Sequence, residues 1–224
     1  MHEEAGIQGD PAAKELLKRA YEKTSRWGDS FPGFKADLTI NENGAAYKGR
    51  VTVRATKETE VALELPAEKE PLLQWVQNQI GMMVTHRASR PFDASDGQYQ
   101  ITFGEPHSNH PLGRQILIHG DGMNSRYRIK EDRIQQIDRN PGRIRFTINI
   151  EDAMTTSDGK FLTTQYVVYY FSPDGTLSRV ESFTDRPFEL KGTYLPGYRR
   201  VIANDAGEIV VRIFQFANHE LLAS

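Results

Sequence analysis

The stretch from Glu70 to Arg87 constrains the fold most, because it carries an apolar stripe at helical spacing. Apolar side chains recur there at steps of three and four residues, the period of one face of an α-helix. The stripe comprises Leu72, Leu73, Val76, Ile80, Met83 and Val84, with Trp75 beside it. Pro71 suits a first helical turn, where its missing N–H costs no hydrogen bond. We therefore expect a long amphipathic helix over residues 70–87 that buries this stripe against a sheet.

A second, shorter helix is predicted near the N-terminus. Asp10 is a suitable N-cap acceptor, and Pro11 follows at the first helical position. The apolar face of this helix consists of Leu16, Leu17, Ala20 and Tyr21. We expect the helix to end near Trp27-Gly28 and residues 1–10 to be disordered.

Outside these helices the apolar residues alternate with a period of two, which is typical of β-strands. About three strands precede the long helix, and eight or nine follow it between Asp-Gly turns. The later strands are expected at residues 98–103, 115–119, 125–130, 133–138, 143–151, 161–171, 177–185, 198–203 and 209–216. Short turns join antiparallel neighbours, and so large a sheet must curl. The prediction is an α+β, mostly-β fold: a strongly curved antiparallel half-barrel of about 11 strands wrapping the long helix, as a single domain over residues 1–224.

The composition excludes several classes of function. The 224 residues carry a formal net charge of −2, which argues against a nucleic-acid-binding protein. Because there is no cysteine, disulfides, thiolate catalysis and Cys-ligated metals are excluded. No apolar run reaches the roughly 18 residues of a membrane-spanning helix, and the first residues do not resemble a signal peptide. We expect a soluble, cytoplasmic protein, or a stromal or periplasmic one if a leader has been removed.

Short motifs scattered over most of the chain resemble a known family. They are Phe31-Pro32-Gly33-Phe34 with Ala36, Tyr47-Lys48-Gly49 with Val51, Thr85-His86-Arg87, Gly120-Asp121 with Ser125-Arg126-Tyr127, the strand 134–139, and Tyr194-Leu195-Pro196. They resemble an uncharacterised family of cyanobacteria and plant plastids, known only as a domain of unknown function. The order of elements also looks like that of periplasmic lipoprotein carriers, in which helices cover the apolar cavity of an incomplete β-barrel. These resemblances imply a fold and no activity.

The first functional hypothesis is a non-enzymatic carrier that holds a lipophilic ligand, a lipid or a pigment, between the sheet and the long helix. A half-barrel with a helix inside often leaves space that an apolar molecule can fill. The candidate ligand-binding residues are Trp75, Val76, Ile80, Met83, Val84, His86 and Arg87. The two cationic residues at the helix end could hold an anionic head group. The alternative is that the stripe is ordinary core and that these cations only satisfy the helix C-terminus.

The second hypothesis is a protein-interaction or assembly factor that acts without a ligand. Residues 126–145 contain seven basic side chains against three acidic ones. The candidate surface for an acidic protein partner comprises Arg126, Arg128, Lys130, Arg143 and Arg145. The first three alternate along one strand and therefore project from one face. The alternative is a solvated sheet face whose long cations discourage edge pairing.

A third hypothesis, a metal-dependent enzyme, rests on His107 and His110. Two imidazoles three residues apart can share a divalent metal, and Glu105 could add an oxygen ligand. The alternative is a polar loop with solvated histidines. The chain has no G-x-S-x-G, P-loop or G-x-G-x-x-G motif. We therefore expect no catalytic residue, no cofactor and no metal.

Overall fold

The structure is a computed structural model that describes residues 7–106, 109–205 and 207–223. Its two α-helices in that part of the chain are α1 (Pro11–Glu22) and α2 (Glu70–Arg87). The bounds of α2 are those predicted from its apolar stripe. Short 3-10 turns span Ala67–Lys69, Phe92–Ala94 and Asp96–Gln98. Residues 1–10 were expected to be disordered. Residues 1–6 lie outside the described range, whereas Asp10 forms the N-cap of α1.

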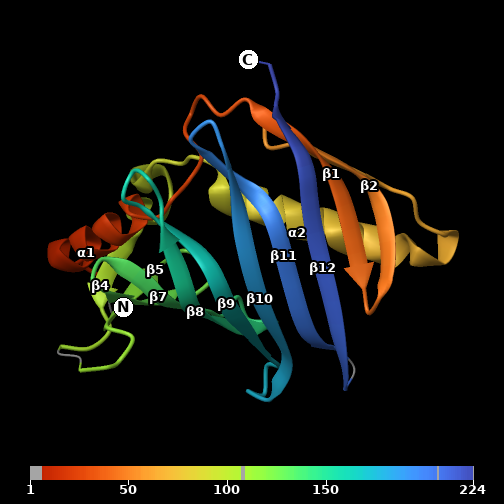
Figure 1. The fold of residues 1–224 in the computed structure, drawn as a ribbon. Helices are drawn as coiled ribbons and strands as arrows, with labels where there is room; N and C mark the ends of the chain where they lie inside the picture. Colours follow the sequence, from red (N-terminus) through yellow and green to blue (C-terminus); the bar gives the residue numbers. More distant parts are fainter. Residues whose placement is uncertain (1–6, 107–108, 206, 224) are drawn as a thin grey trace. The chain divides into compact units, whose positions relative to one another are not determined.

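The described residues form twelve β-strands. These are β1 (Gly33–Glu42), β2 (Ala45–Arg54), β3 (Thr59–Leu63), β4 (Gln100–Phe103), β5 (Arg114–His119), β6 (Arg126–Lys130), β7 (Arg133–Arg139), β8 (Arg145–Thr155), β9 (Phe161–Phe171), β10 (Leu177–Leu190), β11 (Thr193–Asp205) and β12 (Glu208–Leu221). Their hydrogen-bonded order is β3-β2-β1-β12-β11-β10-β9-β8-β7-β6-β5-β4. Strands that are consecutive in the chain are neighbours in this order, except β3 and β4, which end it, and β1 pairs with β12 (Figure 1). The pairs β1–β2, β1–β12, β8–β9 and β11–β12 are antiparallel. The predicted mostly-β antiparallel fold with one long helix and an N-terminal helix is confirmed.

The chain divides into two compact units. Unit 1 comprises Met1–Ser25 and Arg90–Glu181, and unit 2 comprises Arg26–Ser89 and Ser182–Ser224. Each unit contains one α-helix, and the boundary between Glu181 and Ser182 falls within β10. That the chain folds as a single domain stays a prediction.

In unit 1, α1 packs on strands β4, β6 and β7. The helix begins at a strong cap, because Asp10 Oδ1 accepts from the backbone N–H of Ala12 at 2.8 Å and Ala13 at 3.3 Å. The core beneath it consists of Ala13, Leu17, Ala20, Tyr21, Phe92, Ile101, Ile116, Ile118, Tyr127 and Ile129. Each such apolar side chain contributes roughly 1.5–3 kcal/mol when fully buried, so this core alone accounts for the position of α1.

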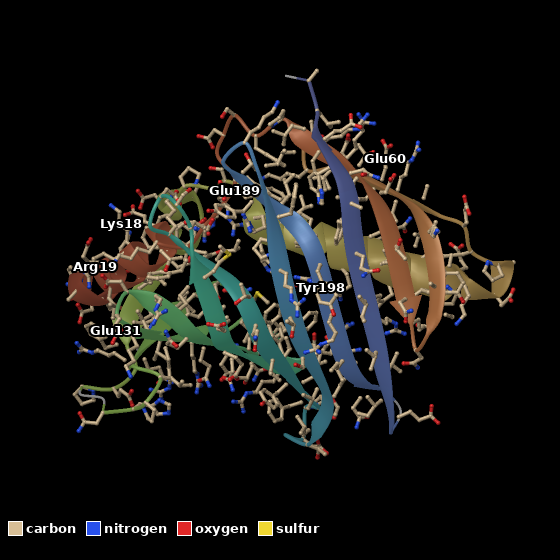
Figure 2. The ribbon with its side chains drawn as sticks, viewed as in Figure 1. Lys18, Arg19, Glu60, Glu131, Glu189 and Tyr198 are labelled. Carbon is tan, nitrogen blue, oxygen red and sulfur yellow. The ribbon has the colours of Figure 1, made fainter. Side chains whose placement is uncertain are left out.

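The predicted end of α1 near Trp27-Gly28 is wrong, because the helix ends at Glu22. The next residues turn to β9 instead: the N–H of Phe161 donates to the Lys23 carbonyl at 2.7 Å, and the N–H of Ser25 donates back to the Phe161 carbonyl at 2.8 Å. Cationic residues on α1 face outward, and Figure 2 shows Lys18 and Arg19 projecting from the helix.

In unit 2, α2 packs against the sheet formed by β1–β3, β11 and β12, and Figure 1 shows it crossing behind these strands. The β1–β2 hairpin turns at Asn43 and Gly44, which have φ values of 49° and 100°, as a two-residue hairpin turn requires. The inward residues of β1 are Phe34, Ala36, Leu38 and Ile40, and all four are buried. The alternation of β1 therefore presents one apolar face to α2.

Candidate ligand-binding site at the end of α2

The structure packs most of the apolar stripe of α2 against protein. Val76, Ile80 and Val84 are 0%, 1% and 2% exposed. Trp75 is half-buried, with its ring centroid 5.5 Å from that of Phe214. Of the other candidate ligand-binding residues, Met83 is half-buried and His86 is exposed. The middle of α2 is therefore filled, and space for a ligand has to be sought at its ends.

A hollow of about 200 Å³ lies in unit 2 beside the C-terminal turn of α2. Its apolar lining includes Trp27, Phe31, Val84 and Ala88, and the rings of Trp27 and Phe31 stack with centroids 4.3 Å apart. The polar side chains around it are Asp29, Arg54, Lys57 and Ser89. The lining of the hollow thus combines apolar and charged side chains, as expected of a site for an amphiphilic molecule.

Local sequence explains why residues 26–33 close the end of α2. The backbone N–H of Trp27 donates to the carbonyl of Arg87 at 2.7 Å, which satisfies one of the free carbonyls at the helix C-terminus. Gly33 then starts β1 with φ at +95°, and a Cβ there would collide with the Val53 carbonyl oxygen. The glycine therefore allows the chain to turn sharply from the hollow into the sheet.

Arg87, the last residue of α2, lies against Trp27. Its guanidinium carbon is 5.4 Å from the centre of the Trp27 ring, within the range of a cation–π contact. Arg87 Nη2 donates to the Tyr194 carbonyl at 3.2 Å, and Trp27 Nε1 donates to the same oxygen at 2.9 Å. Arg87 Nε is buried and has no hydrogen-bond partner among the described residues. Burial lowers the pKa of Arg87 to about 10, although the nearby Asp185 carboxylate opposes this change.

Asp185, on β10, is already engaged by a second buried arginine. Arg199 on β11 is 6% exposed, and its Nε and Nη2 each lie 2.7 Å from one carboxylate oxygen of Asp185. This is a bidentate pair, the strongest geometry between these groups. Gln79 of α2 is also buried, with its Oε1 at 3.5 Å from Arg199 Nη1. Both carboxylate oxygens of Asp185 are thus bound by Arg199, and Asp185 acts on Arg87 only through its charge.

The N-terminal end of α2 is held by an ionic cluster at Glu42. Lys69, which caps the helix, lies 2.8 Å from Glu42, and Arg212 of β12 lies 2.7 Å from the other carboxylate oxygen. Burial raises the pKa of Glu42, but hydrogen bonds from both cations outweigh this and leave the pKa below its usual value. Arg212 also lies over the Trp75 ring at 4.5 Å. Both cations at this end contact a carboxylate oxygen, whereas no described residue forms an ion pair with Arg87 at the other end.

Unit 1 contains its own buried polar cluster, centred on Arg139. Arg139 Nη2 donates to the Tyr127 hydroxyl at 2.7 Å, while its Nε is buried without a partner in the described structure. Burial raises the pKa of Tyr127 to about 12 and also raises that of Asp96. Burial alone would lower the pKa of Arg139, yet Tyr127, Asp96 and Asp121 together raise it above its usual value.

Two of the five cations of the proposed partner surface are ion-paired. Arg128 lies 2.9 Å from Glu105, and both Nε and Nη2 of Arg145 contact Asp138, at 3.0 and 3.1 Å. Four of the five are exposed, namely Arg126, Lys130, Arg143 and Arg145, and Arg128 is half-buried. The positive charge of this face is therefore smaller than the sequence count indicates, and its role as a partner surface stays a prediction.

Of the two candidate metal ligands, His107 and His110, the structure describes only His110. His107 lies outside the described residues, and His110 accepts a hydrogen bond at Nδ1 from the Leu112 N–H at 3.1 Å. Within the described ranges no cluster of three or more His, Cys, Asp or Glu residues is arranged to hold a metal ion. In the same ranges no helix has the length and apolar character needed to cross a membrane.

The fold and the hollow define a class of protein: an antiparallel β-sheet protein in which a helix packs on one sheet face and a small amphiphilic hollow adjoins the helix end. The chain belongs to the family described as "Protein of unknown function (DUF3386)", which matches residues 8–222. This membership confirms the resemblance to a family of unknown function. No curated protein matches the chain.

Two solved structures are similar in fold over nearly their whole length. One is an "outer membrane lipoprotein-sorting protein domain" from Vibrio parahaemolyticus, with 8% identity, a TM-score of 0.36 and coverage of 93% of this chain and 92% of that chain. The other is a DUF1329 family protein from Desulfovibrio piger, with 9% identity, a TM-score of 0.32 and coverage of 96% and 94%. Identities and TM-scores this low carry no information about what the present chain binds.

Proposed function

We propose that this protein is a non-enzymatic binding protein or carrier for a lipophilic molecule, a lipid or a pigment, and that the ligand enters at the C-terminal end of α2. The observation that carries this proposal is the hollow lined by Trp27, Phe31, Val84 and Ala88. Aromatic and aliphatic side chains with a few polar groups at the edge are the usual lining of a site for apolar ligands.

Val84 connects the hollow to the rest of the proposed site. It lines the hollow and also belongs to the buried stripe of α2 that continues through Ile80 and Val76. A volume of about 200 Å³ is below that of most ligand pockets, so the hollow takes one end of an extended molecule. Because the middle of α2 is filled, the remainder would extend from the hollow past the C-terminal turn of α2, where the flexible side chain of Met83 can change its conformation.

Filling the hollow tests the proposal. Ser89→Trp places a large ring in it from a half-buried position, whereas Met82→Trp adds the same ring at an exposed position on α2. Binding is measured by the fluorescence of dansyl-labelled undecanoic acid, and folding by thermal unfolding. We expect the wild type and Met82→Trp to bind the probe, and Ser89→Trp to bind at least about tenfold more weakly, a difference of about 1.4 kcal/mol, with an unchanged melting temperature.

Two results would contradict the proposal. The first is a wild type that does not bind the probe, and the second is an Ser89→Trp variant that is folded and binds as well as the wild type.

A further inference from the structure

Arg87 brings a positive charge into unit 2 without a carboxylate of its own. Among the residues that the structure describes, none forms an ion pair with it, and both oxygens of Asp185 are engaged by Arg199. Arg26 adds repulsion to Arg87. A buried cation that is not compensated is costly, because the low dielectric of the interior does not replace its hydration. An anion that binds beside Arg87 would remove this cost.

The guanidinium of Arg87 also has unused hydrogen-bonding capacity. It carries five N–H donors in a planar fork, and its one hydrogen bond to the described protein is the bond from Nη2 to the Tyr194 carbonyl. The Nε donor is buried and unpaired. Adjacent N–H groups of a guanidinium match the two oxygens of a carboxylate or a phosphate.

Arg87 lies next to the hollow, so its N–H donors are close to a ligand bound there. Its guanidinium lies over the Trp27 ring, and Trp27, Val84 and Ala88 all line the hollow. Arg54 and Lys57 add positive charge around it, while Glu60 pairs with Arg54 at 2.7 Å and Asp29 adds one negative charge. A molecule whose apolar part lies against Trp27 would therefore have its polar end near cations.

We propose that Arg87 binds the anionic oxygen group, a carboxylate or a phosphate, of an amphiphilic ligand whose apolar part occupies the hollow. This inference rests on the proposed function and specifies it: the ligand is an anionic amphiphile, not a neutral lipid or pigment. The cation–π contact with Trp27 holds the guanidinium in place for the anion, and the indole closes the apolar side.

The test compares an acid with its neutral ester. Dansyl-labelled undecanoic acid and its methyl ester share the apolar chain and differ in the charged group. Both are titrated into the wild type, Arg87→Gln, Arg87→Lys and the control Arg50→Gln, which removes an exposed cation of the same unit that does not line the hollow. A charge-assisted hydrogen bond contributes about 1.5–3 kcal/mol, so we expect the wild type to prefer the acid by about 10- to 100-fold.

The variants locate this preference. Arg87→Gln should bind acid and ester equally, with its affinity for the ester within about twofold of the wild type, a change of about 0.4 kcal/mol. Arg87→Lys should keep part of the preference, because it keeps the charge without the planar fork. Arg50→Gln should keep all of it, because Arg50 lies outside the hollow. Equal binding of acid and ester by the wild type, or a preserved preference in Arg87→Gln, would overturn the inference while the carrier function stands.

If neither probe binds, thermal unfolding with inorganic phosphate at constant ionic strength distinguishes failure of the carrier proposal from failure of the anion site at Arg87. In that case the carrier proposal fails. A rise in the melting temperature of the wild type with phosphate, absent in Arg87→Gln, would retain an anion site at Arg87 for a free anion. No rise would overturn the anion site as well.

Discussion

Both units contain an arginine whose Nε is buried and unpaired in the described structure, and Arg139 of unit 1 differs from Arg87 of unit 2 in how its charge is compensated. In unit 1, Asp96 and Asp121 lie near Arg139 and raise its pKa above the usual value despite burial. In unit 2, burial dominates at Arg87 and lowers its pKa to about 10. We therefore expect the arginine side chain to stabilise the fold in unit 1 and to oppose it in unit 2.

This difference shows which buried polar group has a structural role and which is available for a ligand. A charge that is matched by carboxylates and hydrogen bonds holds strands in register and has no need of a further partner. A charge that is left unmatched reduces stability, and such groups persist where function requires them. Substitutions at the two arginines should accordingly have opposite effects on stability.

The largest effect is expected for Arg139→Met. Removing this cation leaves Asp96 and Tyr127 buried without their positive partner, and breaking such a cluster typically costs about 3–5 kcal/mol of unfolding free energy. Urea unfolding at pH 7 measures the loss. Arg143→Met, at an exposed position outside the strands, is the control and should change stability by less than about 0.5 kcal/mol. A loss of unfolding free energy below about 1 kcal/mol in Arg139→Met would show that the polar cluster around Arg139 does not stabilise unit 1.

The second effect has the opposite sign. Arg87→Met removes the unmatched charge and keeps an apolar side chain against Trp27, so we expect a gain of about 1–2 kcal/mol in the protein without ligand. The Tyr194 carbonyl remains satisfied, because Trp27 Nε1 still donates to it at 2.9 Å. The same urea unfolding series measures the gain. If the variant is instead less stable than the wild type by more than about 1 kcal/mol, the cation–π and hydrogen-bond contacts of Arg87 outweigh its desolvation.

The smallest effect concerns pH and Asp96. Because burial raises the pKa of Asp96 in the folded protein, the folded chain binds this proton more tightly than the unfolded chain. Protonation therefore stabilises the fold as the pH falls through the folded pKa towards the ordinary value of 3.8. Relative to Asp96→Asn, the wild type should gain stability on acidification from neutral pH to about pH 4, by less than either arginine effect.

Asp132 gives the contrast within the same unit. Hydrogen bonds from Lys23 and Arg19 lower its pKa, so its contribution is present above the ordinary value and is lost as the pH falls through the lowered pKa. Relative to Asp132→Asn, the wild type should therefore lose stability on acidification. Unfolding free energies of both variants at several pH values test the two signs, and equal behaviour of the two would contradict them.

The regular elements could be predicted where one period runs without interruption. The apolar stripe predicted a helix over residues 70–87, and the apolar run at residues 161–171 predicted a strand. The structure has α2 and β9 with these bounds. Prolines limited the prediction elsewhere. β10 continues through Pro187 and β11 through Pro196, although the missing N–H usually places proline at a strand end or an edge. β8 extends beyond its predicted end because a bulge around Asp152 breaks the alternation.

The candidate site was less predictable because it is assembled by distant parts of the chain. Arg87 could be selected from its place at the helix end, but Trp27 contacts it across a separation that no local pattern encodes. Arg199 had a usable signal. It stands two residues before Val201 on the inward face of β11, and a charge at an inward strand position demands a buried partner. Asp185, which provides that partner, has no comparable pattern.

The contact between Trp27 and the end of α2 also makes the helix observable by light. The chain has two tryptophans. Trp27 lies against the last residue of α2, and Trp75 lies in its second turn beside Phe214. A Trp75→Phe variant emits from Trp27 alone, and a Trp27→Phe variant from Trp75 alone. Because indole emission is absorbed by a dansyl group, energy transfer in the two single-tryptophan proteins compares the distances from a bound probe to the two ends of the helix.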